Sequence, residues 1–116
     1  MNEVDQATLA LADMLFNARR AVDYMEQGGA EWYDDEMLLD AIAHRIRELT
    51  EAAKYRFPPT RQIEYPDLPW VEMIRTRDLF THHYRKVDRF ELRKIVEDHL
   101  PPLIAYLEAL DIPDIE

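Results

Sequence analysis

The side chains best suited to chemistry lie in one ten-residue stretch, Arg75 to Tyr84. This stretch reads RTRDLFTHHY, with two arginines, an aspartate, two adjacent histidines and a tyrosine. A histidine exchanges protons near neutral pH, and a guanidinium keeps its charge and can form two parallel hydrogen bonds to a phosphate. Metal-free cleavage of an RNA phosphodiester needs a base for the 2′-hydroxyl proton, an acid for the leaving oxygen and positive charge beside the phosphorus. One chain offers one suitable histidine and one suitable arginine for such a reaction.

The charge of the chain is distributed unevenly. Its net charge is −10, which is the wrong sign for general nucleic-acid binding. Residues 75–94 nevertheless carry seven basic and three acidic side chains, a net +4, so the remainder carries −14. One basic island in an acidic molecule favours a confined phosphate site over a long nucleic-acid groove, and a solvated charged helix face is the alternative.

The bulk composition predicts a single all-α domain spanning residues 1–116. The chain has 47% apolar residues, enough for one core, and only two glycines, too few for the many turns of an all-β fold. It has no cysteine, which excludes disulfides and thiolate zinc sites. No apolar run is long enough to span a membrane and no signal peptide is evident, so we expect a cytoplasmic protein without a membrane partner.

Apolar residues at intervals of three and four predict four helices. The first covers about residues 4–27 and stops at Gly28-Gly29, and the second covers about 36–55, with Asp34 or Asp35 as its cap. A proline-rich loop should follow from Phe57 to Asp67. These elements should form an antiparallel four-helix bundle.

The remaining two helices frame the reactive stretch. Pro69 should be the first residue of the third helix, with Trp70 and Ile74 on its apolar side. Asp88 and Glu91 resemble a capping box for the fourth helix, and Pro101-Pro102 should kink it. Its expected apolar stripe consists of Leu92, Val96, His99, Leu103, Tyr106 and Leu110.

Helical geometry limits how the reactive groups can meet. In a continuous helix Arg77 and Tyr84 share one stripe, whereas His82 lies about 140° from Arg77 at 100° per residue. Either the helix ends near His82 and the turn redirects the side chain, or two copies of the stretch meet across a dimer.

The spacing of the reactive residues resembles that of the HepT family of HEPN-type helical ribonucleases. The family pattern is an arginine, four to six residues, a histidine, one residue and a tyrosine, which Arg77, His82 and Tyr84 match. Asp78 occupies the position where relatives often have asparagine. The likeness extends to further segments of the chain: Leu68-Pro69-Trp70, Val87-Asp88 and Leu100-Pro101-Pro102-Leu103.

This resemblance implies a HEPN-like fold and a metal-independent ribonuclease toxin whose composite active site lies between the two protomers of a homodimer. His82 would be the general acid or base, Arg77 the phosphate-stabilising group and Asp78 an orienting group. Aspartate there could pair with His82 and raise its pKa, or weaken RNA binding. Further RNA-binding candidates in the basic island are Arg75, Arg85 and Lys86.

The resemblance also implies regulation by a partner protein. In such a type VII-like toxin–antitoxin pair, a minimal nucleotidyltransferase attaches AMP to the motif tyrosine, here Tyr84. The added phosphodiester would bring negative charge and bulk beside the site and silence it. The resemblance implies neither a cofactor nor a metal.

Other interpretations of the same residues stay open. The chain could be a non-catalytic HepT-like antitoxin or binding protein that holds the nucleotidyltransferase, or a generic helical adaptor. Arg77 and Asp78 could form ordinary salt bridges. Two carboxylate–histidine pairs at helical spacing, Asp40 with His44 and Asp78 with His82, could hold a metal, although the Glu-x-x-His signature of di-iron bundles is absent.

Overall fold

Every regular element in the described part of the chain is helical. The computed structural model describes residues 5–82 and 88–113, and no strand occurs within those ranges. The α-helices are α1 (Gln6–Gly28), α2 (Glu36–Glu51), α3 (Trp70–His82), α4 (Arg89–Lys94) and α5 (Leu100–Glu108). Short 3-10 helices cover Trp32–Asp34 and Pro59–Glu64, and π-helical turns cover Ala52–Arg56 and Ile95–His99. The expected all-α class is therefore confirmed.

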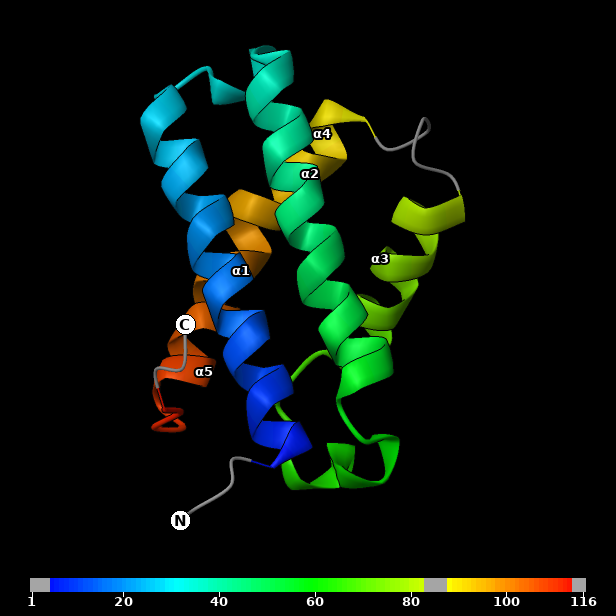
Figure 1. The fold of residues 1–116 in the computed structure, drawn as a ribbon. Helices are drawn as coiled ribbons and strands as arrows, with labels where there is room; N and C mark the ends of the chain where they lie inside the picture. Colours follow the sequence, from blue (N-terminus) through cyan, green and yellow to red (C-terminus); the bar gives the residue numbers. More distant parts are fainter. Residues whose placement is uncertain (1–4, 83–87, 114–116) are drawn as a thin grey trace.

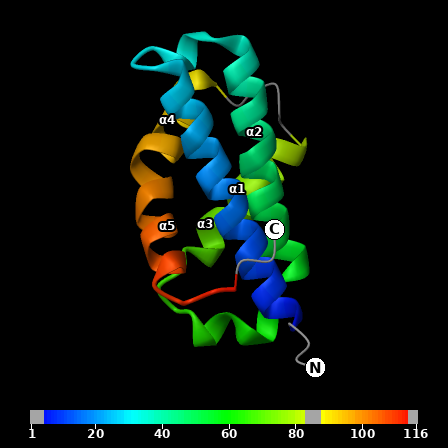
Figure 2. The same ribbon diagram turned by 60° about the vertical axis from the view of Figure 1, so that its left-hand side comes forward.

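The long helices follow one another in alternating directions, as Figure 1 shows. Seen from the side, α1 lies between α2 and α5, and it packs against both (Figure 2). The more specific assignment to a HEPN-like four-helix bundle stays a prediction. Within the described residues no helix has both the length and the apolar character needed to cross a membrane.

Local sequence signals set the limits of α1 and α2. The Asp5 carboxylate accepts a hydrogen bond from the Thr8 amide at 2.8 Å and thereby caps α1. Gly29 ends α1 with a φ of 76°, a conformation that a residue without a Cβ adopts easily. Asp35 caps α2 by accepting from the Met37 and Leu38 amides. The expected stop and cap are both confirmed.

The segment between α2 and α3 is more ordered than the expected proline-rich loop. It contains the 3-10 helix Pro59–Glu64, and its ends are joined by aromatic contacts. The Phe57 ring lies 4.6 Å from the Trp70 ring and 5.7 Å from the Tyr65 ring, centroid to centroid. The Trp70 indole N–H donates to the Tyr65 carbonyl at 2.9 Å. These contacts fix the start of α3 beside the end of α2.

The buried stripe of α3 differs from the expected pair Trp70 and Ile74. Trp70, Met73 and Phe80 are buried, whereas Ile74 is only half-buried. Arg77 lies on that same stripe, four residues after Met73 and three before Phe80. The helix itself begins at Trp70, with Pro69 just before it.

The last helical segment is divided in two where the prolines were expected to disturb it. Asp88 caps α4 by accepting from the Glu91 amide at 2.8 Å. The chain then passes through the π-helical turn Ile95–His99, and α5 begins with Leu100, so the prolines occupy its first turn, where a missing amide costs little. Of the expected stripe, Leu92, Val96 and Leu103 are buried, and Tyr106 and Leu110 are half-buried and pack against the core. The position of His99 was wrong, because His99 is exposed and its neighbour Leu100 is buried.

Candidate functional site

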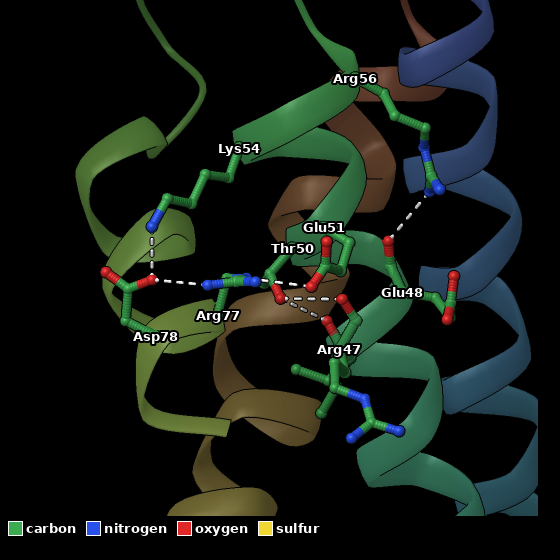
Figure 3. Close-up of polar contacts among 9 residues, drawn as sticks. Arg47, Glu48, Thr50, Glu51, Lys54, Arg56, Arg77 and Asp78 are labelled. Atoms are coloured by element: carbon green, nitrogen blue, oxygen red, sulfur yellow. Dashed lines mark hydrogen bonds and ion pairs between the residues drawn. The ribbon is translucent and has the colours of Figure 1, made fainter. Parts of the chain in front are cut away.

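Arg77 is held in a fixed orientation between α3 and the end of α2. Its side chain is only 13% exposed. The guanidinium donates from Nε to Glu51 Oε1 at 3.0 Å and from Nη1 to Asp78 Oδ1 at 3.2 Å (Figure 3). Its Cζ also lies 4.5 Å from the centre of the Tyr55 ring, a cation–π distance. Burial lowers the pKa of Arg77, but the hydrogen bonds to Glu51 and Asp78 outweigh burial and raise it overall, so the group stays charged.

Asp78 is paired with a lysine that the sequence did not single out. Lys54 Nζ lies 2.6 Å from Asp78 Oδ1, the same oxygen that accepts from Arg77 (Figure 3). The hydrogen bond from Lys54 is the main cause of the lowered pKa of Asp78, and it raises the pKa of Lys54 in return. In the described structure Asp78 therefore pairs with Lys54 and Arg77, and the hydrogen bond to His82 that we considered is not formed.

Three of the contacting residues come from one helical face at the end of α2. Glu51, Lys54 and Tyr55 are spaced by three and four residues, and the π-helical turn Ala52–Arg56 carries the last two. Each of the three side chains contacts Arg77 or Asp78 of α3. We call Glu51, Lys54, Tyr55, Arg77 and Asp78 the Arg77 cluster. π-Helical turns are frequent at functional sites, although such a turn alone identifies none.

The sequence analysis missed Glu51, Lys54 and Tyr55. They lie 22 or more positions before their partners, so no local motif joins them to Arg77. The sequence feature that could have indicated them is the spacing of a glutamate, a lysine and a tyrosine on one face of a helix that ends just before two prolines.

His82 and Arg75 lie apart from the Arg77 cluster. Both are exposed, and α3 is still helical at His82, so the backbone does not redirect the histidine toward Arg77. At 100° per residue the side chains of Arg77 and His82 project about 140° apart. The part of α3 that faces solvent also carries Val71, which is 63% exposed. Tyr84, Arg85 and Lys86 lie outside the described residues.

A separate cleft of about 410 Å³ lies between α3 and the α4–α5 segment. Its walls are mostly apolar, with Met73, Leu79 and Phe80 from α3 and Leu100 and Leu103 from α5. Of the sequence candidates among the described residues, Arg75 lines it, whereas Arg77, Asp78 and His82 do not. This cleft is therefore distinct from the Arg77 cluster.

The proposed metal pairs do not come together as a larger set. Across residues 5–82 and 88–113, no three His, Asp or Glu side chains are grouped so that they could hold a metal ion. The Asp78 carboxylate is already engaged by two cations.

Comparison with known proteins confirms the resemblance to the HepT family. A family model described as "Ribonuclease HepT-like" matches residues 14–110. A protein of Thermococcus cleftensis named "Probable ribonuclease HepT" is 30% identical over 103 residues, which cover 84% of this chain and 93% of the relative. No solved structure matches.

Two proteins of Methanocaldococcus jannaschii that carry the name "Putative RNase" are also similar. One is 27% identical over 94 residues, covering 80% of this chain and 85% of the relative. The other is 30% identical over 107 residues, covering 91% of this chain and 87% of the relative. Since the family model and the relatives span most of the chain, this protein belongs to the HepT-like ribonuclease family.

Proposed function

We propose that this protein is a metal-independent RNA endonuclease and the toxin of a type VII-like toxin–antitoxin pair. Membership of a ribonuclease family supports the reaction class. The observation that carries the proposal is the state of Arg77. A guanidinium has five N–H donors, and Glu51 and Asp78 use two of them. Within the described structure three donors thus remain for a phosphate, on a side chain that is already oriented.

In the proposed reaction His82 accepts the proton of the RNA 2′-hydroxyl. The 2′-oxygen then attacks the adjacent phosphorus, and the bond from phosphorus to the 5′-oxygen breaks. The 5′-oxygen takes a proton from a second His82, which leaves a 2′,3′-cyclic phosphate and a 5′-hydroxyl end. Arg77 stabilises the negative charge that develops on the phosphoryl oxygens.

We propose that the site is completed by a second copy of the chain. Arg77 and His82 project about 140° apart on α3, so one chain does not bring them onto one phosphate. Val71, which is 63% exposed on α3, provides apolar surface for a partner to cover. A two-fold axis through this surface would supply two arginines and two histidines to one scissile bond. The domain would be an antiparallel HEPN-like bundle, as the family resemblance implies.

The charge of Asp78 is compatible with this proposal because Lys54 neutralises it. An unpaired aspartate beside Arg77 would repel the substrate phosphate. With Lys54 Nζ 2.6 Å away, the carboxylate acts instead as a support that orients the guanidinium.

We further propose that a minimal nucleotidyltransferase silences the toxin by attaching AMP to Tyr84. Negative charge two residues after His82 would compete with the RNA phosphate for the basic groups of the same stretch. Arg75, Arg85 and Lys86 would help to bind RNA in the unmodified state. Co-expression with the partner, followed by mass spectrometry of the intact protein, tests this step, and an unmodified Tyr84 in a stable complex would contradict it.

The acidity of the molecule favours one alternative, a non-catalytic binding protein. The net charge is −10, and the four charged side chains of the Arg77 cluster cancel one another. A protein that only holds the nucleotidyltransferase has no need of an attractive site for RNA. Binding without RNA cleavage in the assay below would establish this alternative.

The deciding experiment compares RNA cleavage and growth arrest for the wild type, Arg77→Ala and His82→Ala. His44→Ala serves as the matched control, because His44 is also an exposed helical histidine but lies on α2. We expect cleavage products with cyclic phosphate ends from the wild type and the control alone. Equal cleavage by the wild type and His82→Ala would remove the catalytic proposal. Light scattering of the same samples tests for the dimer.

A further inference from the structure

The ring of Tyr55 lies beside the arginine of the proposed site and has no assigned role. Tyr55 is 57% exposed, although it belongs to the π-helical turn that packs against α3. The Arg77 guanidinium covers one part of the ring at 4.5 Å, and Lys54 Nζ lies 5.3 Å from the ring centre. The ring therefore has an exposed part that is bordered by two cations.

The charge of the protein makes such a ring useful for binding RNA. With a net charge of −10, the chain cannot rely on general attraction of phosphates for affinity. Stacking of an unpaired base on an aromatic side chain supplies affinity that does not depend on charge. Only a base that is not held in a duplex can take that position.

Resting on the proposed ribonuclease function, we propose that Tyr55 is a stacking platform for an unpaired base next to the phosphate bound by Arg77, so that the substrate is single-stranded RNA. A phosphate on the remaining Arg77 donors lies within one nucleotide of the ring, because the guanidinium and the ring are in contact. The base then stacks on the exposed part of the ring, and Lys54 borders the same surface. The duplex form of the same sequence binds poorly.

Binding is measured with a short RNA that carries 2′-O-methyl groups. This RNA has no free 2′-hydroxyl at those positions and stays intact whether or not the protein is a ribonuclease. The full-length variants Tyr55→Leu, Tyr55→Phe and Tyr55→Trp are compared with the wild type. Phe90→Leu is the matched control, because Phe90 is 65% exposed but lies on α4 away from the Arg77 cluster.

We expect Tyr55→Leu to weaken binding of the single strand by roughly 5- to 150-fold, the range found for loss of one stacked base. Tyr55→Phe should bind like the wild type, Tyr55→Trp at least as tightly, and Phe90→Leu unchanged. The salt dependence separates stacking from displacement of Arg77. Loss of stacking leaves the slope of log affinity against log salt unchanged, whereas loss of one phosphate contact makes this negative slope shallower by about 0.7 for a single strand.

Three outcomes overturn the platform: equal binding by Tyr55→Leu and the wild type, a changed salt slope in Tyr55→Leu, or duplex binding as tight as single-strand binding. Absence of RNA binding by the wild type also overturns it. The proposed function fails separately, since a wild type that binds the methylated strand through Tyr55 but does not cleave an unmodified strand retains the platform and loses the ribonuclease.

Discussion

Replacing Arg77 with methionine separates a functional arginine from a structural one. Arg77 occupies the position on the buried stripe of α3 between Met73 and Phe80, and its side chain is 13% exposed. An unbranched apolar residue fits that position and gains free energy from burial. Replacing both members of a buried ion pair with apolar residues is often neutral, whereas removing one member destabilises the protein when the other charge is left buried.

The carboxylates that Arg77→Met leaves behind are not stranded in the core. The side chains of Glu51 and Asp78 are 30% and 44% exposed, so water can reach them, and Asp78 keeps Lys54. We therefore expect Tm to stay the same or to rise by about 2–5 °C. Cleavage should fall by about 100- to 1,000-fold in kcat, the usual loss when one donor to a developing negative charge is removed.

Circular dichroism gives Tm, and cleavage of a fluorescently labelled single-stranded RNA gives kcat and KM. Arg19→Met is the control, because Arg19 forms an ion pair with Glu108 at 2.8 Å on an exposed part of the molecule. Arg19→Met should leave both Tm and the cleavage kinetics unchanged. A fall in Tm of more than about 5 °C in Arg77→Met, with cleavage lost in proportion to unfolding, would show that the ion pairs of Arg77 serve the fold.

Further predictions concern Lys54, Asp78 and Gly28. Lys54→Met should reduce cleavage by roughly tenfold, because Asp78 would lose one of its two cationic partners and its negative charge beside the phosphate would be less neutralised. The same change in an Asp78→Asn background should cost little, and equal losses in both backgrounds would mean that Lys54 contacts RNA directly. Hydrogen bonds lower the pKa of Asp78 below 3.8, so folding favours the ionised carboxylate. The contribution of Asp78 to stability is therefore complete above about pH 4 and is lost as the pH falls through the lowered pKa. Asp78→Asn should remove this part of the pH dependence of stability, measured by urea unfolding. Gly28→Ala should destabilise the protein by about 1–2 kcal/mol in urea titrations, because the new Cβ would lie 2.4 Å from Leu38 Cδ1 and 2.7 Å from Trp32 Cβ. This clash outweighs the helical preference of alanine. Unchanged stability would show that both neighbours can move.

The helices and their caps were predictable from the sequence because they depend on local chemistry. Asp5 was not foreseen as a cap, whereas Asp88 was expected as one. Asp35 was one of two candidate caps, and Gly29 belonged to the glycine pair that was expected to stop α1. The division of the last helix was predictable in position from its prolines. Its buried stripe was not, since His99 and Leu100 are adjacent and the pattern alone does not choose between them.

The Arg77 cluster was only half predictable. Arg77 and Asp78 belong to a local motif, whereas Glu51 and Lys54 reach them across an interhelical contact. The interhelical contact depends on how α3 packs against α2. The ring contact between Phe57 and Trp70 helps to set that packing, and no short sequence pattern predicts it. The burial of Arg77 could not be predicted from the sequence either, because a charged residue within an apolar stripe normally indicates an exposed position.

The cancellation of charge in the Arg77 cluster bears on how fast RNA finds the protein. Two cations and two anions lie within a few ångströms of one another, so their fields nearly vanish at the distance from which a polyanion approaches. Since the whole molecule is acidic, diffusion is not steered toward the site. The association rate constant should therefore be nearer 10⁵–10⁶ M⁻¹s⁻¹ than the roughly 10⁸ M⁻¹s⁻¹ of steered encounters, and the protein would pass most cellular RNA without capturing it.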